Sequence, residues 1–218
     1  MKKLFILIIF FSSCSLFLFA QGKSINTSIY PVPEFNNEVN FINKEDMTLR
    51  RLEKGSSKME SKAKMGGMGG GESGYTMEGN KSFVRLPGGN NLSFIFYNGS
   101  NTSSSHQTDS IMRANGMDPT VMKNNMEMMT DPSRNTTLYS MNEEKGNRKI
   151  TVMAYQGMKL FGKSKKESTK YSLSVKKIRD GYYELIVDKP LPKGEYAFVK
   201  MDFGNADGSY SLFAFGID

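Results

Sequence analysis

Methionine is unusually frequent in the middle of this sequence, and its thioether is the side chain here best suited to metal chemistry. The chain has 16 methionines and a single histidine, His106. Met122, Met126 and Met129 are spaced i, i+4, i+7, which places them on one face of a helix. Soft thioether ligands suit Cu(I), and the imidazole of His106 could complete such a site. We favour the other interpretation, a soft apolar stripe that packs on a sheet, because methionine fills irregular gaps well.

A second cluster is basic. Residues 159–179 contain one acidic residue, Glu167, against eight basic ones. Such a run could contact nucleic acid, anionic lipid or acidic polysaccharide. The candidate contacts are Lys163, Lys165, Lys166, Lys176 and Lys177, and aromatic stacking surfaces for bases or sugars could come from Tyr182, Tyr183, Tyr196 and Phe198. We favour a solvated loop and edge strand, where lysines discourage edge-to-edge aggregation, and we do not expect nucleic acid as a partner.

Residues for catalysis are few. A zinc site or an acid–base pair needs partners for His106, and the sequence offers no second histidine. Ser73 lies in a Gly-Glu-Ser-Gly sequence that resembles a serine-nucleophile turn, but its surroundings are of low complexity. Two carboxylates could meet from anywhere in the fold and support hydrolysis, although no spacing singles out a pair. We therefore expect a protein that is not an enzyme.

The first twenty residues have the pattern of a secretory signal peptide. Lys2 and Lys3 precede apolar runs at residues 4–11 and 16–20, and Ala20 stands before a polar stretch, so cleavage is expected after Ala20. The protein is then exported, to the periplasm or the extracellular space. Cys14, the only cysteine, gives an alternative as a lipidated membrane anchor, and an uncleaved anchor is a further alternative. Without Cys14 the mature chain has no disulfide.

The remaining sequence is organised as one domain. Residues 21–36 are polar and proline-containing, typical of a leader or edge segment, and residues 37–218 form a single domain of modest positive charge, the whole chain carrying +7. Residues 55–74 are rich in Gly, Met, Lys and Ser, with almost nothing to bury, which predicts a flexible loop.

Short apolar runs separated by turn residues predict the secondary structure. Hairpins are expected at residues 37–52 and, across Pro87-Gly88-Gly89, between residues 82–86 and 92–97. Asp118 followed by Pro119 predicts the start of one short helix around 118–129, and Asp131-Pro132 predicts its end. About ten short strands at this spacing predict a mostly β fold, an antiparallel β-sandwich or a distorted barrel. The strands at 92–97 and 182–187 are apolar on both faces and should be central.

The last portion of the chain resembles uncharacterised secreted bacterial β domains of unknown function. The resembling residues are Asp131-Pro132, the sequence Leu-Pro-Lys-Gly-Glu-Tyr-Ala at 191–197 and the terminal Phe-Gly-Ile-Asp at 215–218. The resemblance implies a β fold in which Gly194 supplies a turn and Gly216 a close approach or bulge, and it implies no activity. The final strand, with Leu212, Phe213 and Phe215, should be buried next to residues 196–201.

These observations favour an exported, non-catalytic binding or accessory β domain of the cell envelope or extracellular space, with no cofactor. Its partner would be another envelope protein or a polysaccharide, with membrane contact only through Cys14 or an uncleaved signal. The first alternative is a periplasmic protein that handles Cu(I) through its methionine face, and the second is a hydrolase with a carboxylate pair. The tripeptide Asp109-Ser110-Ile111 resembles a short O-glycosylation acceptor pattern of secreted bacterial proteins.

Overall fold

The computed structural model describes residues 30–63, 70–89, 91–99, 106–155, 167–201 and 208–218, without the side chains of residues 106–108, 123, 126, 127, 129 and 155. Contacts divide the chain into Met1–Tyr30 and Pro31–Asp218, and the fold described below belongs to the second unit. The expected signal peptide at 1–20, including Cys14, lies outside the described residues. Among the described residues, no helix has the length and apolar character needed to cross a membrane.

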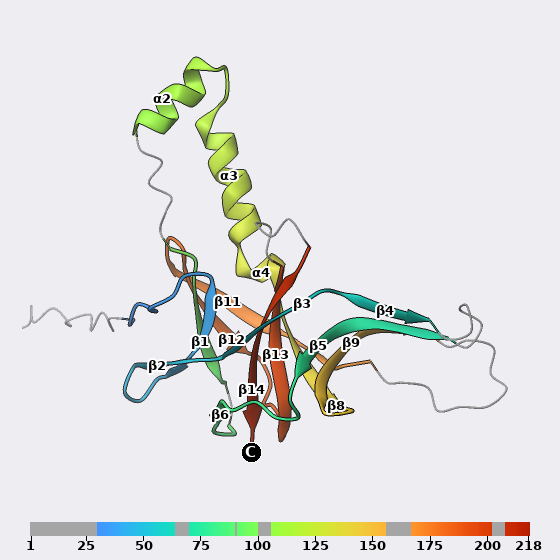
Figure 1. Cartoon of the computed structure of the whole chain (residues 1–218). Coiled ribbons are helices and arrows are strands. Elements are labelled where there is room, and N and C mark those ends of the chain that lie inside the picture. The colour runs from blue at the N-terminus through green and yellow to red at the C-terminus, as the bar shows by residue number, and fades with distance from the viewer. Residues whose placement is uncertain (1–29, 64–69, 90, 100–105, 156–166, 202–207) are drawn as a thin grey trace, which may run out of the picture. The chain divides into compact units, whose positions relative to one another are not determined.

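The fold is mostly β and consists of two antiparallel sheets, as the sequence predicts (Figure 1). The first sheet contains, in spatial order, β11 (Leu173–Arg179), β12 (Tyr182–Val187), β7 (Ser93–Tyr97), β1 (Glu38–Asn43) and β2 (Thr48–Arg51). The second contains β3 (Glu53–Ser57), β14 (Tyr210–Ile217), β13 (Gly194–Met201), β8 (Thr136–Glu144), β9 (Asn147–Tyr155), β5 (Gly71–Glu78) and β4 (Glu60–Ala63), with β10 (Lys170–Tyr171) beside β8 and β6 (Arg85–Leu86) parallel to β14.

The two sheets pack on each other through an aromatic core, here called the inter-sheet core. Its largest members are Phe94 and Phe96 from β7, Phe198 from β13, and Phe213 and Phe215 from β14, all at most 1% exposed. The Phe94 ring lies 4.8 Å from that of Phe198 and 5.2 Å from that of Phe215, centroid to centroid. These contacts confirm that β7 and β12 are interior strands and that the last strand is buried beside β13.

The second sheet curls into a half-barrel around its other face. Tyr75, Met141, Ile150, Val199 and Leu212, from five different strands, form this barrel core. The backbone N–H of Thr76 on β5 donates to Ser57 Oγ on β3 at 3.2 Å, although the two strands are far apart in the sheet order. The ring of Tyr75 on β5 and the ring of Tyr210 on β14 lie 4.9 Å apart, centroid to centroid, inside the half-barrel.

One segment expected to be a loop forms strands instead. Residues 55–74 include part of β3, all of β4 and the start of β5, while residues 64–69 lie outside the description. The prediction from poor apolar content is wrong here because ladder hydrogen bonds join backbone groups and need no large side chain. A bulge between Ser73 and Gly74 marks where β5 shifts register against β9.

The hairpin predicted between residues 82–86 and 92–97 is also wrong. β6 pairs with β14 in the second sheet, whereas β7 pairs with β1 and β12 in the first. The turn residues after Leu86 therefore carry the chain from one sheet to the other. The hairpin predicted at 37–52 is confirmed, since β1 pairs with β2.

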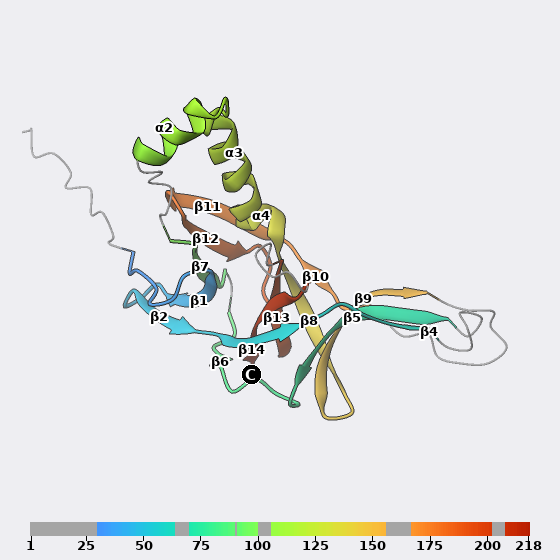
Figure 2. The same ribbon diagram turned by 45° about the horizontal axis from the view of Figure 1, so that its top comes forward.

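The helical part is larger than expected. The predicted helix is confirmed as α3 (Pro119–Thr130), and two further helices, α2 (His106–Ala114) and α4 (Pro132–Asn135), flank it. All three lie between β7 and β8 in the chain, above the sheets in Figures 1 and 2.

The bulge in β5 gives the first prediction. A Cβ added at Gly74 would lie 1.8 Å from the backbone oxygen of Ile150, so Gly74→Ala must displace β5 from β9. We expect this variant to lose about 1–3 kcal/mol of unfolding free energy, measured by urea denaturation, as overpacked sites do. The control is Gly89→Ala, whose added Cβ meets nothing within 4 Å. Equal unfolding free energies for the two variants would contradict the close contact between Gly74 and β9 at the bulge.

Candidate functional site

The helical hairpin of α2 and α3 is turned by backbone hydrogen bonds after Ala114. The Met117 N–H donates to the Met112 carbonyl at 2.9 Å, and the Gly116 N–H donates to the Arg113 carbonyl at 3.0 Å. Gly116 has φ +72°, a left-handed conformation that glycine adopts without a Cβ penalty. This pair of bonds is the Schellman motif that ends many helices. The asparagine–glycine pair at 115–116 is the sequence signal that could have predicted α2.

Aspartates define both ends of α3. The carboxylate of Asp118 accepts a hydrogen bond from the Thr120 N–H at 2.8 Å, with Pro119 at the first helical position, as the sequence predicts. Asp131 ends α3 and also caps α4, accepting from the Ser133 N–H at 2.9 Å. α4 contacts β8, β11 and β13, and Pro132 is buried, so α4 fixes the base of the hairpin on the sheets.

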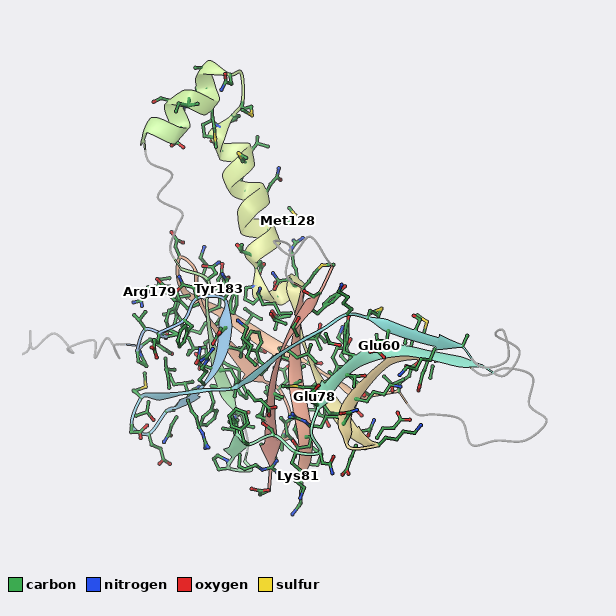
Figure 3. All side chains as sticks on the ribbon, viewed as in Figure 1. Glu60, Glu78, Lys81, Met128, Arg179 and Tyr183 are labelled. Atoms are coloured by element: carbon green, nitrogen blue, oxygen red, sulfur yellow. The ribbon has the colours of Figure 1, made fainter. Side chains whose placement is uncertain are left out.

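The hairpin exposes large apolar side chains. Among the described side chains between residues 111 and 128, five large apolar ones are 45–56% exposed: Ile111, Met117, Val121, Met122 and Met128. Figure 3 shows Met128 on α3, above the strands. A continuous apolar patch on a soluble domain marks an interaction surface, whereas single exposed apolar residues are ordinary. Five within one short hairpin make it the candidate binding site.

The structure tests the expected methionine face at Met122, one of its three members. Met122 is 45% exposed, so the packing expected for this side chain is wrong. The cause is that α3 stands on α4 and not along a sheet face, so the i, i+4, i+7 stripe does not need to meet strands. The side chains of Met126, Met129 and His106 lie outside the described residues. Within the described chain, no group of three or more His, Cys, Asp or Glu side chains could hold a metal.

The basic run is described only in part. Lys163, Lys165 and Lys166 lie outside the described residues, while Lys176 and Lys177 are exposed on β11, an edge strand of the first sheet. Lys177 Nζ lies 3.0 Å from Asp180 Oδ1. Ser110, in the expected acceptor tripeptide, is exposed on α2.

The aromatic residues expected to stack on bases or sugars do not form a platform. Tyr182, Tyr183, Tyr196 and Phe198 are each at most 5% exposed. The Tyr182 hydroxyl donates to the Pro31 carbonyl at 2.7 Å, and the Tyr196 hydroxyl donates to the Pro192 carbonyl at 2.5 Å. These four rings are buried and stabilise the core. The stacking prediction is wrong because the presence of aromatic residues in a strand does not show which face of the sheet is covered.

Buried carboxylates occur on the face of the first sheet opposite the inter-sheet core. Glu38 and Glu184 are 3% and 2% exposed. Arg51 donates two hydrogen bonds to Glu38, at 2.7 and 2.9 Å, and Lys54 donates a third at 3.0 Å. Lys44 Nζ lies 2.8 Å from Glu184 Oε1. Both carboxylates are thus held in ion pairs, an arrangement that stabilises strand positions and differs from the free acid–base pair of a hydrolase.

Two neutral polar groups on the same face have no hydrogen-bond partner among the residues that the structure describes. They are Asn40 Nδ2 and Ser93 Oγ, on neighbouring strands and at most 6% exposed. An unsatisfied buried group costs about 1–3 kcal/mol. Asn40 lies opposite Ile95 in the pairing of β1 with β7, and Ile95 is fully buried.

A cluster that the sequence analysis missed forms around Arg85. Its guanidinium donates to Glu195 Oε1 and, at 2.7 Å, to Asp218 Oδ1. It rests directly against Gly216, where an added Cβ would lie 1.6 Å from Arg85 Nη1. Gly216 therefore provides the expected close approach. Three of the residues that carry the resemblance, Glu195, Gly216 and Asp218, contact Arg85, which is not one of those residues. The cluster fastens β14 to β6 and to the start of β13.

The ion pairs of Glu38 predict a pH dependence. Burial acts to raise the pKa of Glu38, but the hydrogen bonds and charges of Arg51 and Lys54 outweigh it and lower the pKa below its ordinary value. The resulting stability is present above pH about 4.5 and is lost as the pH falls through the lowered pKa. We expect Glu38→Gln to cost on the order of 1–2 kcal/mol at pH 7 and to flatten the acid limb of a melting-temperature profile. Glu45→Gln, in the exposed β1–β2 turn, should leave the profile unchanged; an identical profile in both variants would contradict this role.

Comparison with known protein families, curated proteins and solved structures finds no match to this chain.

Proposed function

We propose that this protein is an exported binding module whose α2–α3 hairpin docks onto an apolar surface of another protein. The observation that carries the proposal is the exposure of Ile111, Met117, Val121, Met122 and Met128 on one short hairpin. These side chains are already about half buried, so burying the rest of one against a partner contributes about half of the roughly 1.5–3 kcal/mol that full burial provides. Export rests on the signal-like pattern of residues 1–20.

The chemistry of the hairpin suits binding of this kind. Methionine is unbranched and polarisable, so an exposed methionine surface adapts to the shape of its partner. The hairpin itself is held in shape by the Schellman turn and by the caps at Asp118 and Asp131. A defined backbone with adaptable side chains loses less conformational entropy on binding than a loop.

The proposal predicts position-dependent crosslinking. A photoreactive side chain placed at Val121 or Met128 should form an adduct with a partner in the producing cell, because both positions lie on the exposed apolar surface. The control is Phe83, which is 77% exposed but lies in the segment before β6, away from the hairpin. The paired substitution Val121→Ser and Met128→Ser should abolish an adduct formed from Ile111, with a stability change within about 0.5 kcal/mol per site, as for exposed positions.

Two results would contradict the docking surface. One is equal adduct formation from Phe83 and from the hairpin positions. The other is an adduct from Ile111 that survives the paired substitution while circular dichroism shows an intact fold.

A second candidate function is Cu(I) binding through the thioethers of the hairpin. It is favoured by the exposure of Met117, Met122 and Met128, at 45–53%, since an exposed thioether is free to bind a soft metal. Among the described residues, these sulfurs come from α3 and from the turn that precedes it.

The copper proposal predicts a thermal shift. Adding Cu(I) under reducing, anaerobic conditions at 100 times its dissociation constant should stabilise the wild type by about 2.7 kcal/mol. Met122→Ala should reduce the shift while leaving the metal-free protein unchanged, because this side chain is exposed. The control is Met153→Ala, on β9 and 59% exposed, which should keep the full shift. An unshifted wild type, or equal shifts in both variants, overturns copper binding and leaves the docking proposal standing.

A further inference from the structure

Strand β4 has an edge that is open among the described strands. It lies at one end of the second sheet and pairs with β5 alone, through Glu60↔Gly74 to Ala63↔Gly71. All four of its residues are exposed. In Figures 1 and 2, β4 and β5 extend together to the right, and Figure 2 shows the end of β9 beside them. An exposed edge presents unpaired backbone groups to which another strand can bond.

The charges on this edge differ from those on the edges of the first sheet. β11 carries Lys176, Lys177 and Arg179, and β2 carries Arg50 and Arg51. Lys177 is paired with Asp180 and Arg51 with Glu38, and the other three basic residues leave each edge with positive charge that opposes pairing with a second copy. β4 instead carries Glu60 and Lys62, which already form an ion pair of 3.1 Å within the strand. Figure 3 shows Glu60 on this strand. Balanced charge removes the usual obstacle to self-pairing.

The order of residues in β4 is complementary to itself in one antiparallel register. With Ser61 opposite Ser61 of a second copy, each Glu60 faces the other copy's Lys62. Met59, which is 47% exposed and precedes the strand, then faces Ala63. Shifting the register by one residue on each copy places Glu60 opposite Glu60 or Lys62 opposite Lys62. Directly opposed unlike charges stabilise a strand pair, and like charges destabilise it.

We propose that two copies of this protein associate through their β4 strands, in a two-fold antiparallel pair centred on Ser61 that joins the two sheets edge to edge. A two-fold axis requires the same patch on both copies, and β4 meets this requirement with charge pairs on one face and Met59 against Ala63 on the other. The pair covers few residues and is smaller than a standard interface, so the dimer depends on concentration. This inference is independent of the α2–α3 docking surface.

The test uses a single engineered thiol. In a Cys14→Ser background, which removes the only natural cysteine, Ser61→Cys places two sulfurs on the two-fold axis. Cross-strand Cα separations of about 4.5–5.5 Å fall within the range that a disulfide bridges. Mild oxidation with diamide should therefore produce a covalent dimer. The matched control is Ser174→Cys, exposed on the basic edge strand β11, which should crosslink much more slowly.

Charge reversal distinguishes this pairing from random collision. Adding Glu60→Lys makes both charge pairs repulsive and should slow crosslinking roughly tenfold. Adding Lys62→Glu as well restores unlike charges and should recover the rate. Urea denaturation of each variant verifies that the fold is retained. Crosslinking from Ser61→Cys no faster than from Ser174→Cys, or a rate unaffected by Glu60→Lys, overturns the proposal.

Discussion

The burial of β13 and β14 on both faces is the constraint on which the rest of the fold depends. Phe213 and Phe215 point into the inter-sheet core, while Leu212 and Ala214, between and beside them, point into the barrel core. The same strands are thus the common wall of the sandwich and of the half-barrel. Because residues 196–200 and 211–217 of this wall are all buried, a slip of one residue in register would exchange the two cores, which differ in size and in aromatic content.

The sequence predicts the features that depend on local pattern and on apolar content. Asp118 and Pro119 predict α3, the apolar run at the end of the chain predicts that the last strand is buried beside residues 196–201, and the unbroken apolar runs predict that β7 and β12 are interior. Each of these follows from residues close together in the chain. The mostly β class follows in turn from the number and spacing of such runs.

Features that depend on distant residues could not be predicted in this way. Arg85 and Glu195 are 110 residues apart in the sequence, so no local motif predicts their contact. β6 and β7 separate into different sheets because their partners, β14 and β1, lie elsewhere in the chain. The exposure of Met122 depends on α4, which directs α3 away from the strands, and an i, i+4, i+7 pattern alone does not say whether anything covers the face.

The buried ion pairs and the α2–α3 hairpin place polar and apolar groups in opposite ways. Glu38 and Glu184 are buried with cations beside them, and Arg148, 1% exposed, donates to both oxygens of Glu53 between β9 and β3. A wrong strand pairing would leave one of these charges buried without its partner, which is costly in a dry site. The hairpin reverses this arrangement, with apolar groups outside, and for this reason we propose it as a surface that binds another protein.

The position of the helices in the chain affects how this fold can vary. They occupy one connection, between the last residue of β7 and the first of β8, and they end at α4, only four residues long. The strands on either side take their registers from β1, β12 and β13 and not from the helices. The connection is therefore a place where evolution can lengthen, shorten or rewrite a recognition element while the scaffold stays constant, much as antibody frameworks tolerate new loops.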